Sequence, residues 1–168
     1  MTMSTVGQDA DLAATVRGLL DRVEIEELFT RYYSGMDVGD PEGFGRYFVE
    51  DAHLDVNGYV ANGWAEIGAL YRAVSADKPR LTGQFRMILS NLVIKLDGDT
   101  ATAQMLWTQT LNDTIKGPPR LIEQGREFDI LVRQGDRWRI AKRVVIADSG
   151  LPDIFDETYT PRADYKIA

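Results

Sequence analysis

Three residues of this chain have the types and spacing of an acid–base site: Tyr32, Asp37 and Arg143. Tyr32 precedes Asp37 by five residues, about one and a half helical turns, so the two side chains can share one pocket. A desolvated carboxylate at Asp37 would have a raised pKa and accept a proton; in the alternative interpretation it only caps the following turn. Tyr32 is interpreted as a proton donor or relay, or else as a core residue whose hydroxyl bonds to backbone.

Arg143 stands among apolar residues of a predicted strand, on the same face as Val145. A buried guanidinium needs a carboxylate or an oxyanion as its partner. We therefore expect Arg143 either to form a structural pair with Asp37 or Glu127, or to stabilise negative charge on a substrate. Strand alternation leaves open whether Glu127 lies on the solvated side or enters the cavity, because it faces away from the apolar Phe128.

The other candidate substrate-binding residues are mainly apolar or aromatic and would form a greasy pocket: Leu54, Val56, Tyr59, Met87, Trp107, Gln109, Glu127 and Val145. Gln109 is a specificity candidate because an amide on an apolar face needs a partner. Trp107 is either core or a ligand platform. Tyr59 either lines the pocket wall or is an exposed turn tyrosine.

The elements that must position these residues are helices followed by strands. Apolar residues recur at helical spacing from Leu12 to Leu20 and again from Asp21 to Met36. A short helix is predicted at 41–48, a strand at 52–58 and a helix at 64–74, followed by strands at 85–96, 100–111, 121–132 and 138–147. This order predicts an α+β fold in which helices pack on one face of a strongly curved antiparallel sheet, because no βαβ alternation is present.

Composition narrows the class of protein. The 168 residues predict one domain, with a core at about 15–148 and a tail at 149–168. The net charge of −7 argues against nucleic acid, and the absence of cysteine excludes disulfides and thiolate chemistry. With His53 as the single histidine, we expect no metal site and no cofactor. Without a signal peptide or a membrane span, we expect a soluble cytoplasmic protein.

Several segments in order resemble one known family: the helix DRVEIEELFTRYYSGMD at 21–37, FVEDA at 48–52, SNLVI at 90–94, DGDTA at 97–101 and GDRWRI at 135–140. They are similar to the SnoaL-like branch of the nuclear-transport-factor-like cone fold over about residues 15–148. The branch contains scytalone dehydratase, bile-acid dehydratases, a dehydrochlorinase, polyketide cyclases and formaldehyde-releasing lyases. The resemblance implies roles for Asp37, Tyr32 and Arg143, but Met87 stands where the family's dehydratases have a histidine.

The sequence and the resemblance together suggest a cofactor-independent lyase. It would eliminate water or a small carbonyl fragment such as formaldehyde from a hydrophobic aromatic or alicyclic alcohol. The alternatives are a non-catalytic binding module, favoured by Met87, and an isomerase or polyketide cyclase.

Two further expectations concern surfaces. Apolar residues on the outer sheet face predict a homodimer or homotrimer. The aromatic tail after Gly150, with Phe155 and Tyr159, is predicted to lie across the pocket mouth or on a neighbouring subunit; the alternative is an ordered strap elsewhere.

Overall fold

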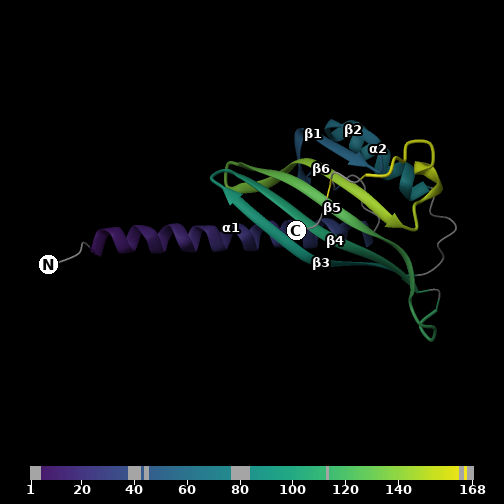
Figure 1. Cartoon of the computed structure of the whole chain (residues 1–168), viewed down its shortest axis with the longest axis horizontal. Helices are drawn as coiled ribbons and strands as arrows, with labels where there is room; N and C mark the ends of the chain where they lie inside the picture. Colours follow the sequence, from purple (N-terminus) through teal and green to yellow (C-terminus); the bar gives the residue numbers. More distant parts are fainter. Residues whose placement is uncertain are drawn as a thin grey trace.

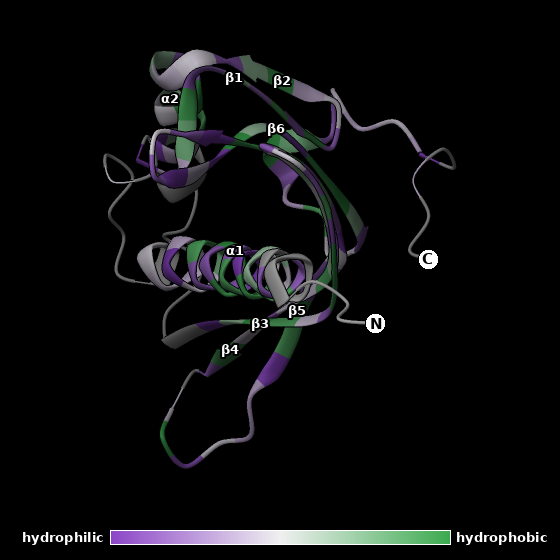
Figure 2. Cartoon of the chain, turned by 90° about the vertical axis from the view of Figure 1, so that its left-hand side faces the viewer, coloured by the Kyte–Doolittle hydropathy of each residue, from purple (hydrophilic) through white to green (hydrophobic). Residues whose placement is uncertain are grey.

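The computed structural model describes residues 5–37, 43, 46–76, 84–112, 114–162 and 165. A long helix, α1 (Thr5–Asp37), is followed by β1 (Phe48–Val56), β2 (Tyr59–Asn62), α2 (Gly63–Ala76), β3 (Gln84–Asp97), β4 (Thr100–Asn112), β5 (Arg120–Gln134), β6 (Arg137–Ser149) and a short 3₁₀ helix, η3 (Asp153–Phe155). The strands form one sheet in the order β2-β1-β6-β5-β4-β3. The sheet curves around α1, as Figure 2 shows. The predicted α+β class is confirmed.

The four predicted C-terminal strands and the 64–74 helix are confirmed, with slightly wider bounds. Two-residue connections link β3 to β4 and β5 to β6, and Gly98 and Gly135 there have positive φ angles, which glycine adopts without strain. One prediction is wrong at its end: the short helix at 41–48 does not reach Phe48, which begins β1. Half of that segment lies outside the described residues.

The expectation of a purely antiparallel sheet is also corrected. β1 pairs with β6 in parallel, with Leu54 opposite Arg143 and Val56 opposite Val145. A parallel pair needs a long connection, which α2 and the β3–β5 meander supply here. Chain order alone could not reveal this pairing, because it forms only when the last strand returns beside the first.

The core fills the space between α1 and the inner face of the sheet. Ile25, Phe29 and Tyr32 of α1 are buried, as are Leu131 and Ile140 on the facing strands. Three polar contacts fix the helix: Asp21 pairs with Arg133 at 2.6 Å, Arg22 donates to the Ile94 carbonyl, and Glu24 accepts from the Trp138 N–H. Together they hold the C-terminal half of α1 over the inner face.

The tail runs in two parts. Phe155 of η3 is buried in the core cluster, whereas Tyr159 is exposed. Further along, Arg162 pairs with Asp55 at 3.1 Å, and the Tyr165 ring packs against Phe128 with centroids 4.8 Å apart.

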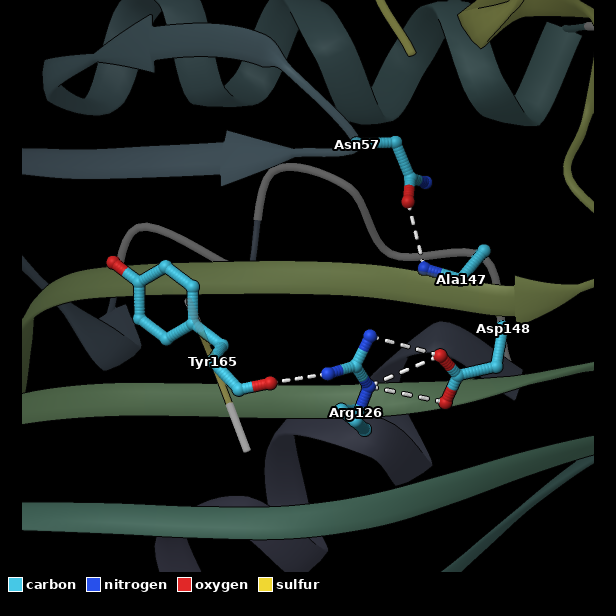
Figure 3. A network of polar contacts seen from close by, with 5 residues as sticks. All are labelled: Asn57, Arg126, Ala147, Asp148 and Tyr165. Atoms are coloured by element: carbon cyan, nitrogen blue, oxygen red, sulfur yellow. Dashed lines mark hydrogen bonds and ion pairs between the residues drawn. The ribbon is translucent and has the colours of Figure 1, made fainter. Parts of the chain in front are cut away.

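This second part of the tail lies on the outer face. Figure 3 shows Arg126 between the Asp148 carboxylate and the Tyr165 carbonyl, to which it donates. The structure therefore matches the strap alternative for Arg162 and Tyr165, while Phe155 closes part of the core.

Candidate functional site

Three ionisable side chains meet on the inner face of the sheet. On β5, alternation turns Glu127 and Asp129 to the same side, and Asp129 stands opposite Arg143 of β6. Arg143 donates through Nε to Asp129 Oδ1 at 2.7 Å, and its Nη2 lies 3.0 Å from Glu127 Oε1. All three are buried, so the arginine holds two carboxyl groups away from solvent.

Tyrosines from both helices complete this cluster. The Tyr33 hydroxyl donates to Glu127 Oε2, and the Tyr32 hydroxyl is hydrogen-bonded to that of Tyr71 on α2. The Arg143 guanidinium lies over the Tyr32 ring, 4.2 Å from its centroid. We call Glu127, Asp129, Arg143, Tyr32, Tyr33 and Tyr71 the inner-face cluster.

The electrostatics of the cluster favour one retained proton. Two ionised carboxylates beside one guanidinium would leave a net negative charge in a desolvated site, which is costly. Burial first, and the nearby charge of Asp129 second, raise the pKa of Glu127 from 4.5 to about 8, despite the opposing effect of Arg143. Burial also raises the pKa of Asp129, while Arg143 opposes the rise. We therefore assign the neutral form to Glu127 near pH 7 and the ionised form to Asp129.

The remaining groups keep their ordinary protonation states. Burial lowers the pKa of Arg143, but the charge of Asp129, joined by that of Glu127 when it is ionised, outweighs this effect and holds that pKa above its usual value. Burial raises the pKa of Tyr33 and of Tyr71, so both stay neutral hydroxyls. The cluster thus contains a neutral carboxylic acid, a fixed cation and neutral phenols, which are the parts of an acid–base site.

The structure places several predicted pocket residues on the same face. Leu54 is buried opposite Arg143, Val145 stands opposite Glu127, and Trp107 is buried on β4. Met87 is half-buried opposite the buried Gln109. The Trp107 indole N–H is buried without a hydrogen-bond partner in the described part of the chain.

Gly125 explains how Trp107 fits. It stands opposite Trp107 on β5, and a Cβ there would lie 2.6 Å from the indole ring. A side chain at this position would displace the indole from the inner face.

Val56 is half-buried on this same face, opposite Val145 and next to the β1–β2 turn. The remaining predicted residues lie elsewhere. Tyr59 is exposed at the start of β2, in agreement with the turn-tyrosine alternative. His53 lies 2.9 Å from Asn62 on the β1–β2 hairpin. Asp37 ends α1, but its side chain lies outside the described residues.

The structure decides the question left open for Glu127, which points inward. It also adds three residues that sequence reasoning missed: Asp129, Tyr33 and Tyr71. Asp129 had a detectable signal, because it is two residues from Glu127 and therefore shares its face. The two tyrosines had none beyond their place in apolar helical stripes.

The described residues contain no group of three or more His, Asp or Glu side chains arranged to hold a metal ion. Nor does any helix in the described ranges have the length and apolar character needed to cross a membrane.

A groove of about 230 Å³ lies on the other side of the sheet. Its lining residues include Val93, Phe128, Ile130 and Tyr165, with Lys95 and Lys142 beside them. These side chains belong to the outer face. Asp129 also lines the groove, although its carboxylate is bonded to Arg143 in the inner-face cluster.

Comparisons with known proteins agree with this architecture. The SnoaL-like domain family matches residues 17–144. An uncharacterized protein of Mycobacterium tuberculosis, Rv2910c, is 29% identical over 136 residues, which cover 77% of this chain and 87% of that protein.

Solved structures agree as well. An NTF2-like protein with a cystatin-like fold from Novosphingobium aromaticivorans has a TM-score of 0.69 and 30% identity, covering 84% of this chain and 91% of its own. A candidate scytalone dehydratase from the same organism has a TM-score of 0.67 and 19% identity, covering 80% and 89%, which shows the fold alone.

Proposed function

Because the chain belongs to the SnoaL-like domain family, we propose that its inner-face cluster is the acid–base site of a cofactor-independent lyase. The reaction eliminates water, or a small carbonyl fragment such as formaldehyde, from a hydrophobic aromatic or alicyclic alcohol. The observation that carries the proposal is the burial of Glu127, Asp129 and Arg143 together against tyrosines on the concave face. The family includes dehydratases and cyclases, so acid–base chemistry without a cofactor suits the fold.

For loss of water, the proposed steps are as follows. A base, for which Asp37 is the candidate, takes a proton from the carbon next to the alcohol carbon. The released electron pair forms the carbon–carbon double bond, and the carbon–oxygen bond breaks. Neutral Glu127 gives its proton to the departing oxygen, which leaves as water.

For loss of formaldehyde, the base takes the proton of a primary hydroxyl group. The carbon–oxygen double bond of formaldehyde forms as the carbon–carbon bond breaks, and the electron pair moves into the conjugated ring system of the substrate. Arg143 stabilises the negative charge that develops there, and Tyr32 relays the proton from the base to the carbon that has lost formaldehyde, so that the product leaves neutral. Asp129 keeps Arg143 in place through their 2.7 Å contact.

The surroundings support an apolar substrate with few polar groups. Leu54 and Trp107 are buried beside the cluster and Met87 is half-buried. The Trp107 N–H is a buried donor that a substrate oxygen would satisfy. Apolar side chains around a few convergent polar atoms are typical of small-molecule sites.

The test is product analysis by mass spectrometry. Aromatic diols, hydroxy-steroids and halogenated ring compounds are incubated separately with the wild-type protein, with Glu127→Gln and with the exposed control Glu157→Gln. We expect loss of water or formaldehyde from at least one compound with the wild type and the control, and a loss of at least about 100-fold with Glu127→Gln. Full turnover by Glu127→Gln would remove Glu127 from the mechanism.

A second function, non-catalytic binding of a small hydrophobic ligand, is favoured by one observation. Met87 packs against the core where the resemblance implies a catalytic histidine. Methionine adapts its shape to apolar ligands but transfers no proton. Saturable binding of a panel compound without any change in its mass would support this function over the lyase.

A further inference from the structure

The N-terminal half of α1 extends beyond the sheet instead of packing against it. Figure 1 shows this half projecting beyond the end of the strands. The first described contacts with the sheet occur near Gly18, where an added Cβ would approach Leu96, and at Asp21 and Arg22. Residues 11–17 are all exposed. The 13 helical residues 5–17 therefore precede the first described contact with the sheet, and a helix of that length is marginal in water on its own.

The helix is nevertheless apolar along one side, from within the projecting half to Val23, just past the first contacts with the sheet. Five aliphatic side chains are 45–63% exposed: Leu12, Val16, Leu19, Leu20 and Val23. At 100° per residue they span an arc of roughly 100°, on the opposite side of the helix from Ile25 and Phe29, which face the sheet. We call these five residues the α1 seam. It faces away from the chain's own core.

We propose that the α1 seam pairs with the same seam of a second copy of this chain, as an antiparallel helix pair. Leu12, Val16, Leu19 and Val23 are spaced four, three and four residues apart, which is the spacing of a helix-pairing stripe. The spacing is the same in either direction. An antiparallel copy therefore sets Leu12 against Val23 and Val16 against Leu19, and the two-fold axis repeats both contacts.

The apolar area exposed along the α1 seam favours a helix as long as α1 as the partner that covers it. Two copies would bring together ten aliphatic side chains that are about half exposed, which with the flanking stems approaches the ~1,000 Å² of a specific interface. A contact of this kind also supplies the packing that the projecting half of the helix lacks.

Charge favours the antiparallel direction. Each copy has a net charge of −7, and an antiparallel pair holds the two sheets at opposite ends of the paired helices. The helix dipoles then also align favourably. A parallel pair would place both acidic bodies at the same end.

The test measures mass in solution by light scattering at micromolar concentration. We expect the wild type at twice 18.9 kDa, Leu19→Glu as a monomer with a dissociation constant raised at least about 100-fold, and Ala14→Glu as a dimer. Ala14 is exposed on the same projecting half but outside the seam, so it controls for the added charge. Circular dichroism checks that each variant is folded.

Two results would overturn the proposal. One is a wild type that does not have the mass of a dimer. The other is a dimer that survives Leu19→Glu but dissociates on Ile130→Glu, which would move the contact to the outer face of the sheet, as its apolar residues also suggest.

The distance between two spin labels tests whether the paired helices run antiparallel. The chain has no cysteine, so a nitroxide on Asp11→Cys reports alone. The antiparallel pair places the two labels about 20 Å apart along the helix axis, whereas a parallel pair places them at the same level. Labels at the same level would overturn the antiparallel arrangement.

Discussion

Replacing Glu127 with glutamine should flatten the pH dependence of stability. Glutamine has nearly the same shape as the neutral carboxylic acid and still accepts the Tyr33 hydrogen bond, but it cannot ionise. In the wild type, the folded state holds the Glu127 proton more tightly than the unfolded state does. Because the folded pKa is raised, stability from this group is fully present below about pH 4.5 and is lost as the pH rises to about 8.

The magnitude follows from the pKa. A change from 4.5 to about 8, at about 1.4 kcal/mol per pH unit, makes the loss on the order of 5 kcal/mol between acid and alkaline pH. That is a large fraction of the 5–15 kcal/mol by which domains are stable. We therefore expect Glu127→Gln to be similar to the wild type near pH 5 and several kcal/mol more stable than it near pH 9.

Urea denaturation at each pH unit from 5 to 9 measures this difference. Glu157→Gln, an exposed matched change, should follow the wild type throughout. Parallel pH profiles for the wild type and Glu127→Gln, separated by less than about 1 kcal/mol at every pH, would refute the retained proton.

Three further predictions concern the packing around the site. Arg143→Met removes the cation between two buried carboxyls and should cost about 3–5 kcal/mol in the free energy of unfolding; adding Asp129→Asn should recover part of it in the same urea assay. Gly125→Ala places a Cβ 2.1 Å from the Ile146 carbonyl oxygen, and it should lower stability by about 1–3 kcal/mol. An unchanged melting temperature would contradict that clash. Phe155→Ala should cost about 3–5 kcal/mol because the ring is buried, whereas the exposed Tyr159→Ala should cost less than about 0.5 kcal/mol; equal calorimetric shifts would contradict the two-part tail.

Local patterns predicted most of the fold. Alternation and Gly/Asp turns identified the four C-terminal strands, because hairpin signals depend on neighbouring residues alone. The parallel contact of β1 with β6 depends on how distant segments pack, which no local pattern records. Apolar spacing predicted two consecutive helical segments, one through Leu20 and one from Asp21 to Met36, which the structure joins into the single helix α1.

The sequence predicted only part of the site, because strand alternation shows which residues share a face but not which face points inward. The cost of an unpaired buried cation predicted a partner for Arg143, with Asp37, Glu127 or a substrate oxyanion as the alternatives; the structure pairs it with Glu127 and also with Asp129, which was not predicted. The direction of Glu127 did not follow, because its apolar neighbour Phe128 is also covered, from the outside, by Tyr165. Both faces of β5 are thus partly buried, and alternation cannot distinguish them.

The pH dependence of kcat/KM on an elimination substrate tests the central claim most directly. If neutral Glu127 is the proton donor, kcat/KM of the wild type falls as the pH rises through about 8, because the acid loses its proton. In Glu127→Gln the rate is low at every pH and this alkaline fall is absent. An equal rate with the same alkaline fall in both proteins would contradict the account.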